Sequence, residues 1–178
     1  MSDIVKGDPK VMDALDKLAT GNDSIQHTED SFGNSYNWYM LDNAQLILDA
    51  AKVLHDAGAR LAIIAAYSRK TGAEHPDYAC YEFVLKGVVY STTVRMDAEN
   101  PTVPSITRLF ANADWHEREM MELYGIKVTN HPRPVRLFLD EELDKGLLGQ
   151  VVPLSVMMNG ANSTDLWERI LSARELDS

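Results

Sequence analysis

Apolar residues at helical spacing predict two helices in the first sixty residues. Within residues 9–19 they recur at steps of three and four, and Pro9 stands where the first turn of a helix tolerates proline. A longer set lies along one face of the second predicted helix: Leu46, Ile47, Ala50, Val53, Leu54 and Ala57. Asp42 and Gln45 predict a capping box before this helix, and Gly58 predicts a left-handed end to it.

Three strands are predicted after the second helix. Residues 60–68 are apolar almost throughout and too short for a confident helix, which predicts a strand buried on both faces. Residues 78–85 alternate, with Ala79, Tyr81, Phe83 and Leu85 on one side. Lys86-Gly87 then offers a tight turn into residues 88–96, so we expect a hairpin with one inward face.

Residues 20–37 are rich in Gly, Asn, Ser and Asp with little periodicity, and are predicted to be a loop. Residues 104–110 carry another helix signal, which leads into a helix at 114–124. This order predicts an α+β fold, a single domain in which an antiparallel or mixed sheet packs against helices. The predicted units are an N-terminal helix and loop at 1–37, the α+β domain at 38–142 and a C-terminal tail at 143–178.

Composition and charge exclude several classes of function. A chain of 178 residues that is 45% hydrophobic can bury a core without disulfides, and its net charge of −10 repels nucleic acid. Cys80 is the only cysteine, so iron–sulfur clusters held within this chain are not expected. A single cysteine also fits a protein of the reducing cytoplasm. The longest apolar run, 61–67, falls far short of the roughly 20 residues of a membrane span, and residues 1–10 lack the pattern of an export signal.

The densest mixture of charged and aromatic residues lies at 113–126, ADWHEREMMELYGI. On a helix, Trp115, Glu119 and Glu122 lie close together, so charged and apolar surface interleave where a solvated helix would separate them. Gly125 predicts a left-handed exit. The sequence NHPRP at 130–134 then predicts a proline-braced extended segment that presents basic side chains.

This region resembles the 30 kDa family of NADH:quinone oxidoreductase subunits, also called the C-subunit family, which is found as well in energy-converting membrane [NiFe] hydrogenases and in formate hydrogenlyase. The family pattern is an acidic-Trp-x-Glu-Arg-Glu helix, a Leu-aromatic-Gly-Ile exit and a His-Pro loop followed by arginine. The matching residues are Asp114, Trp115, Glu117, Arg118, Glu119, Leu123, Tyr124, Gly125, Ile126, His131, Pro132, Arg136 and Leu137. The chain departs from the pattern at Arg133, Pro134 and Val135, where the family has an aspartate, a leucine and paired arginines.

The resemblance implies a non-catalytic scaffold in the peripheral, cytoplasmic arm of a complex-I-type assembly. That assembly would be either a membrane-bound energy-converting [NiFe] hydrogenase, which the departures slightly favour, or NADH:quinone oxidoreductase. The implied partners are the large catalytic subunit and a small iron–sulfur subunit, with contact to the membrane only through the complex. The resemblance implies no cofactor in this chain, and places iron–sulfur clusters and the [NiFe] centre or quinone in partner subunits.

We predict that the mixed-charge helix and the segment after it form a partner interface, because charges buried there need partner groups to complete their hydrogen bonds. Trp115 and Tyr124 are the expected anchors, and the arginines are expected to contact carboxylates or carbonyls, either across the interface or within their own loop. The predicted interface consists of Trp115, Glu117, Arg118, Glu119, Tyr124, Gly125, His131, Pro132, Arg133 and Arg136.

Two other classes of function stay open on the sequence. A stand-alone acidic adaptor would dissociate readily from its target, whereas a scaffold subunit would co-purify with its partners in fixed ratio. A metal-dependent hydrolase is suggested by His116-Glu117, which resembles the start of a zinc-protease helix, but Met120 occupies the place of the second histidine. Nucleotide binding is not predicted, because residues 69–72, RKTG, lack the glycine order of a phosphate loop.

Overall fold

The computed structural model describes residues 7–19, 21, 24–68, 76–97 and 99–139. Within them the chain forms a mixed sheet with helices packed on it, which confirms the predicted α+β class. The helices are α1 Pro9–Asp16, α2 Leu46–Asp56 and α3 Ala113–Leu123, and the strands are β1 Ile25–Glu29, β2 Ser35–Leu41, β3 Arg60–Tyr67, β4 Tyr78–Leu85, β5 Val88–Arg95, β6 Thr102–Pro104 and β7 Lys127–Thr129. None of these helices is long and apolar enough to cross a membrane.

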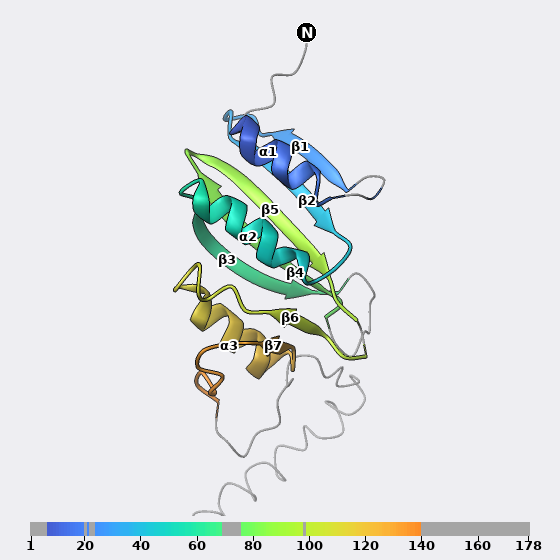
Figure 1. Cartoon of the computed structure of the whole chain (residues 1–178), viewed down its shortest axis with the longest axis vertical. Helices are drawn as coiled ribbons and strands as arrows, with labels where there is room; N and C mark the ends of the chain where they lie inside the picture. The colour runs from blue at the N-terminus through green and yellow to red at the C-terminus, as the bar shows by residue number, and fades with distance from the viewer. Residues whose placement is uncertain (1–6, 20, 22–23, 69–75, 98, 140–178) are drawn as a thin grey trace, which may run out of the picture.

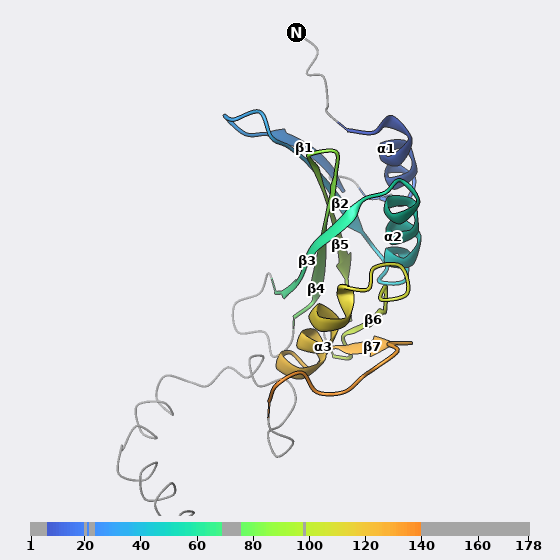
Figure 2. The same cartoon turned by 90° about the vertical axis from the view of Figure 1, so that its left-hand side faces the viewer.

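Five strands form the main sheet in the order β1-β2-β5-β4-β3. The neighbours β2 and β5 run parallel, and the other pairs are antiparallel. Helices α1 and α2 cover one face of the sheet, while α3 and the short parallel pair β6-β7 lie beyond β3, at the opposite end of the molecule from β1 (Figures 1 and 2).

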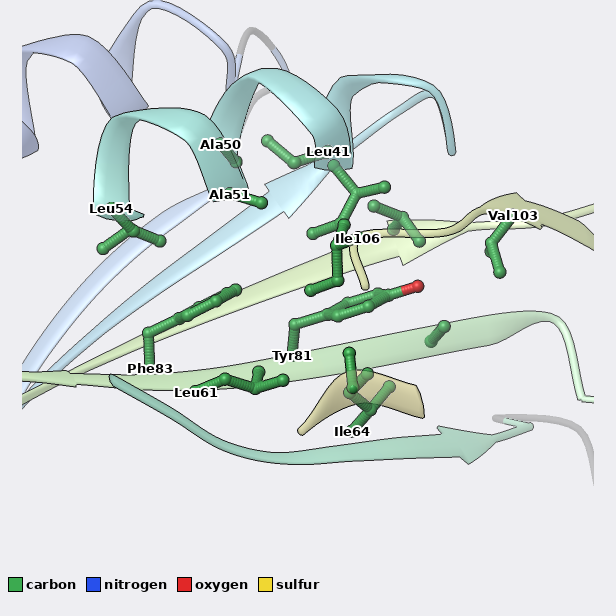
Figure 3. Close-up of a cluster of buried hydrophobic side chains, with 14 of the residues drawn as sticks. Leu41, Ala50, Ala51, Leu54, Leu61, Ile64, Tyr81, Phe83, Val103 and Ile106 are labelled. Carbon is green, nitrogen blue, oxygen red and sulfur yellow. The ribbon is translucent and has the colours of Figure 1, made fainter. Parts of the chain in front are cut away.

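The core lies between α2 and the inner face of the sheet. Leu54 of α2 points toward Phe83 of β4, Ile106 lies against Tyr81 of the same strand, and all four side chains are fully buried (Figure 3). The predicted inward set of β4 is confirmed, since every second residue of that strand is buried. The predicted tight turn is also present, with Lys86 at φ 52° and Gly87 at φ 82°, the left-handed pair of a type I′ hairpin.

The prediction of a loop at 20–37 was wrong, because this region contains β1 and the first residues of β2. In β2 the inward positions include the polar residues Ser35 and Asn37. The sequence of this strand therefore does not alternate between apolar and polar residues. The Asn37 carboxamide oxygen lies 2.7 Å from Nδ1 of His27, its register partner on β1. The predicted domain boundary at residue 37 falls inside β2, and the one at 142, with the tail after it, lies outside the described residues.

The predicted capping box before α2 does not form. The side chain of Asn43 accepts a hydrogen bond from the Gln45 amide at 2.9 Å, and Gln45 itself caps the helix without a side-chain bond. The C-terminal end follows the prediction, with Gly58 at φ 81° and the Ala59 amide donating to the Leu54 carbonyl at 2.9 Å.

Strand β3 is not buried on both faces, as its apolar sequence predicts. It is a terminal strand of the sheet, and the side chains of Ile63 and Tyr67 are 48% and 37% exposed. The helix predicted from the pattern at 104–110 does not form, because β6 is followed there by turns. The Ile106 amide in this stretch donates to the Glu117 carboxylate of α3. The helix predicted at 114–124 is confirmed as α3.

Candidate functional site in α3 and the return segment

Helix α3 ends at Leu123, and Gly125, with a φ of 68°, gives the predicted left-handed exit. The Ile126 amide then donates to the Met120 carbonyl. The chain then forms β7 and runs back beside α3 (Figure 1). We call residues 130–139 the return segment. Its polar backbone atoms and its two basic side chains near the start, His131 and Arg133, are held by acidic and basic side chains of α3.

Glu117 joins α3 to the chain after β6. Its side chain is fully buried and accepts hydrogen bonds from Ser105 Oγ at 2.6 Å, the Ile106 amide at 2.7 Å and Thr107 Oγ1 at 2.8 Å. Three donors on one carboxylate are the arrangement that makes a buried carboxyl group tolerable. Glu117 is therefore a structural crosslink between α3 and residues 105–107.

His131, at the start of the return segment, lies next to the carboxylate of Glu117. Its Nδ1 accepts the Arg133 amide at 3.0 Å, which leaves the ring proton on Nε2, 3.5 Å from Glu117 and 3.8 Å from Asp114. The imidazole is buried and has carboxylate oxygens on its proton-bearing side. The ring thus sets the start of the return segment against α3.

Arg118 binds backbone carbonyls of the return segment, and Glu122 binds its backbone amides. Arg118 donates through Nε to the Val135 carbonyl at 2.9 Å and through its terminal nitrogen to the Arg136 carbonyl. Glu122, one turn later on the same face, accepts three successive amides, those of residues 137, 138 and 139, with the shortest distance 2.6 Å to residue 139. Sequence reasoning did not include Glu122 in the site, although its position four residues after Arg118 on a helix was a usable signal.

Asp114 completes the network at the start of α3. Its carboxylate accepts Arg133 at 2.8 Å and lies 3.5 Å from Arg118. The hydrogen bond from Arg133 holds the pKa of Asp114 below its usual range, against a smaller opposing effect of burial. Arg133, which is more than half exposed, is thereby fixed to α3 at its charged end.

The premise that these charges need foreign atoms was wrong for Glu117 and Arg118. Both are buried, and the chain itself supplies their hydrogen-bond partners. His131 is buried as well, but its Nε2 makes no hydrogen bond within the described residues and lies 3.5 Å from the Glu117 carboxylate. For Arg118 the structure shows the second of the two expected arrangements, contacts to carbonyls of its own loop. Membership of any of the predicted residues in a partner interface stays a prediction.

Large apolar side chains are among the residues that this end of the molecule exposes. Trp115 on α3 is 65% exposed, and Val135 and Phe138 on the return segment are 53% and 65% exposed. Sequence reasoning named Trp115 but missed the other two, which stand beside the backbone groups that Arg118 and Glu122 hold. The remaining predicted residues are exposed, as are Gly125, Pro132 and Arg133, or half-buried, as are Glu119, Tyr124 and Arg136.

The hydrolase alternative receives no geometric support. Glu117, one of the two residues that suggested it, accepts hydrogen bonds from three donors inside the protein. Across the described part of the chain, no group of three or more His, Cys, Asp or Glu side chains is placed to hold a metal ion.

Burial raises the pKa of Glu117 above its usual 4.5, although its hydrogen bonds and His131 act in the opposite direction. A raised folded-state pKa favours the protonated group, so this stabilisation is complete below pH 4.5 and is lost as pH rises through the folded pKa. We predict that the unfolding free energy of wild type rises relative to that of Glu117→Gln as the pH is lowered from 7 toward 4.5. Urea unfolding at a series of pH values measures this, and parallel pH profiles of the two proteins would contradict it.

Comparison with protein families shows to which family this chain belongs. The model of the family described as respiratory-chain NADH dehydrogenase, 30 Kd subunit, matches residues 18–162, and so includes the sheet, α3 and the return segment. The chain belongs to this family.

Relatives in the 30 Kd subunit family match over short stretches. The chain is 41% identical over 61 residues to the C subunit of NADH-quinone oxidoreductase from Roseiflexus sp. (strain RS-1), which covers 34% of this chain and 35% of that protein. It is 50% identical over 42 residues to the J subunit of NAD(P)H-quinone oxidoreductase from Synechococcus sp. (strain CC9605), which covers 24% of this chain and 22% of the relative. These alignments therefore span about a third or less of each curated relative.

Two solved structures share the fold. A trypsin-resistant fragment of Nqo5 superposes with a TM-score of 0.52 at 21% identity, over 70% of this chain and 98% of the fragment. A chain of the membrane-bound sulfane sulfur reductase, an archaeal respiratory membrane complex, superposes with a TM-score of 0.52 at 13% identity, over 74% of this chain and 76% of its own length. At these identities the similarity establishes a common architecture.

Proposed function

We propose that this member of the 30 Kd subunit family is a scaffold subunit in the peripheral arm of a complex-I-type oxidoreductase, and that it carries out no chemistry of its own. The observation that carries the proposal is the family match over residues 18–162. The relatives named for NADH-quinone and NAD(P)H-quinone oxidoreductases support such an assembly, and the fold shared with the membrane-bound sulfane sulfur reductase is consistent with a wider group of respiratory complexes.

The docking surface of this subunit would be the apolar group Trp115, Val135 and Phe138, seated on the large catalytic subunit. Exposed aromatic side chains held on a rigid base are the usual anchors of protein interfaces, because little conformational freedom is lost when they bind. The base here is α3 with the return segment tied to it by Arg118 and Glu122. The buried charges would then shape the surface without being desolvated on docking.

The redox groups of the assembly would belong to partner subunits. Iron–sulfur clusters need several cysteine thiolates, and this sequence has Cys80 alone. We therefore place the clusters, and the [NiFe] centre or quinone site, in the small iron–sulfur subunit and the large catalytic subunit. The proposed location is the cytoplasmic side of the membrane, with membrane contact through the complex, and the net charge of −10 argues against nucleic acid as a partner.

Trp115→Asp is expected to reduce recovery of the large subunit by about tenfold or more when the tagged full-length chain is purified with its complex. Stability should change little, because Trp115 is mostly solvated in this chain. Subunit ratios on gels and thermal unfolding of the isolated chain measure the two effects.

Leu48→Asp on α2 is the matched control, because Leu48 is also an exposed large apolar residue but lies on the helical face of the sheet. Equal losses of the large subunit in both variants would refute docking through α3. A wild-type chain that purifies alone would favour the adaptor function instead.

A further inference from the structure

The turn between β1 and β2 is built around one carboxylate. Asp30 accepts the amides of Phe32 and Asn34 at 2.9 Å each, the Asn34 side-chain amide at 2.7 Å and the Tyr36 hydroxyl at 3.4 Å. Gly33, at φ 81°, also donates its amide to the Asp30 carbonyl. The turn therefore has one well-defined conformation.

This turn presents Phe32 to solvent. The side chain is 90% exposed, the highest value among the large apolar residues of the described chain. Single exposed apolar residues are common on protein surfaces, but this one stands in the turn of a hairpin that projects away from α1 and α2 (Figure 2). A rigid, projecting aromatic residue loses little entropy when a pocket encloses it.

The same hairpin carries a second exposed aromatic residue on the open face of the sheet. Trp38 alternates with the buried Tyr39, so it points away from α1 and α2, and it is 40% exposed. A cavity of about 290 Å³ lies beside it, with Tyr67 of β3 on its lining and the small residues Cys80 and Thr93 between them along the sheet. We call Phe32, Trp38 and this cavity the hairpin surface.

Charge decides which kind of occupant suits the hairpin surface. Within the hairpin, residues 24–41, Glu29 and Asp30 are the only residues among Asp, Glu, Lys and Arg, so its formal charge is negative. Such a surface is repelled by anionic lipid headgroups and by nucleic acid, whereas a protein surface with cationic side chains around an apolar pocket complements it. The hairpin and α3 also lie at opposite ends of the molecule (Figure 1).

We propose that the hairpin surface is a second docking site, which inserts Phe32 into an apolar pocket with a lysine or arginine rim on a protein partner other than this chain. With α3 on the large subunit, the chain would bridge two surfaces of its assembly. The bridging role rests on the proposed function, whereas docking through the hairpin stands on the geometry of Phe32 and Trp38 alone.

Site-specific photo-crosslinking in the purified complex tests the proposal. A photoreactive phenylalanine analogue replaces Phe32 in one sample and Lys52, an exposed residue on α2, in the control. We expect a crosslink from position 32 to a subunit that co-purifies in fixed ratio, at least about tenfold stronger than from position 52. A signal no stronger than the control, or a crosslink to lipid or to a second copy of this chain, would overturn the proposal.

Substitution separates this site from α3. Phe32→Ser should weaken retention of the crosslinked subunit by about tenfold or more, and Phe32→Leu should retain most of it, with the thermal unfolding of both variants unchanged. Loss of partners in Trp115→Asp but not in Phe32→Ser would reject the hairpin site alone. The reverse result would reject docking through α3 and leave the hairpin site standing.

Discussion

Replacing Glu117 by alanine is expected to lower the free energy of unfolding at neutral pH by about 3–5 kcal/mol. The substitution removes the acceptor of Ser105 Oγ, the Ile106 amide and Thr107 Oγ1, and the first two of these residues are buried. Buried donors left without an acceptor keep their full desolvation penalty, which is larger than the net value of the lost bonds. Urea denaturation of the full-length chain measures the change.

Glu119→Ala is the control for this experiment, because Glu119 lies on the same helix, two residues away, and is only half-buried. It should change the unfolding free energy by no more than about 0.5 kcal/mol. Glu117→Gln should fall between the two, since an amide oxygen can still accept the Ile106 amide and hydroxyl groups can rotate to accept from the amide nitrogen. A loss below about 1 kcal/mol in Glu117→Ala would show that the carboxylate is not the crosslink described above.

The second large effect is expected from Arg118→Met, which should lower the unfolding free energy by about 2–4 kcal/mol. Methionine keeps much of the aliphatic stem but cannot donate to the carbonyls of residues 135 and 136. Part of the loss should be local, because the return segment is then held only by Glu122 and by the contacts of its start. Hydrogen exchange at the amides of residues 137–139 should accelerate, because the Glu122 bonds open more often when the segment loosens.

Arg108→Met is the matched control, since Arg108 is exposed and follows β6 outside the α3 network. Its unfolding free energy should stay within about 0.5 kcal/mol of wild type. If Arg118→Met left exchange at residues 137–139 unchanged, the return segment would not depend on Arg118, and the rigid base proposed for Val135 and Phe138 would be lost.

The network also changes the physical basis that would apply to the proposed docking. Mixed charge in α3 suggested an interface completed by a partner, but the chain completes these hydrogen bonds itself. The large apolar side chains that stay exposed are those of Trp115, Val135 and Phe138. Affinity would then come from burial of these side chains, while Arg118 and Glu122 act as positioning residues for the surface.

Periodicity in the sequence was sufficient wherever one element faced a single environment. The inward set of β4, the tight turn at Lys86-Gly87 and the extent of α3 were all predicted, because alternation and helical spacing report directly which side of an element is buried. The left-handed exit at Gly125 was predictable for a similar local reason, since glycine tolerates a positive φ.

Other features depended on contacts between distant segments. Polar residues occupy inward positions of β2, so the strand looked like a loop; for Asn37 the hydrogen-bond partner is His27 on the paired strand. Strand β3 is apolar but lies at the edge of the sheet, a position that composition cannot distinguish from the centre. Residues 105–107 form no helix, and three of their donors bind Glu117, some ten residues further along the chain, a contact that local periodicity could not predict.

Spacing between near neighbours was enough to establish the α+β class, the elements with a clear period and the motif of the 30 Kd family. The sequence could not show which charged side chains of that motif bind within the chain. A glutamate or an arginine is the same letter whether its partner is solvent, another protein or the chain's own backbone. The return segment settles the question for Arg118 and Glu122 by bringing carbonyls and amides from 135–139 against α3.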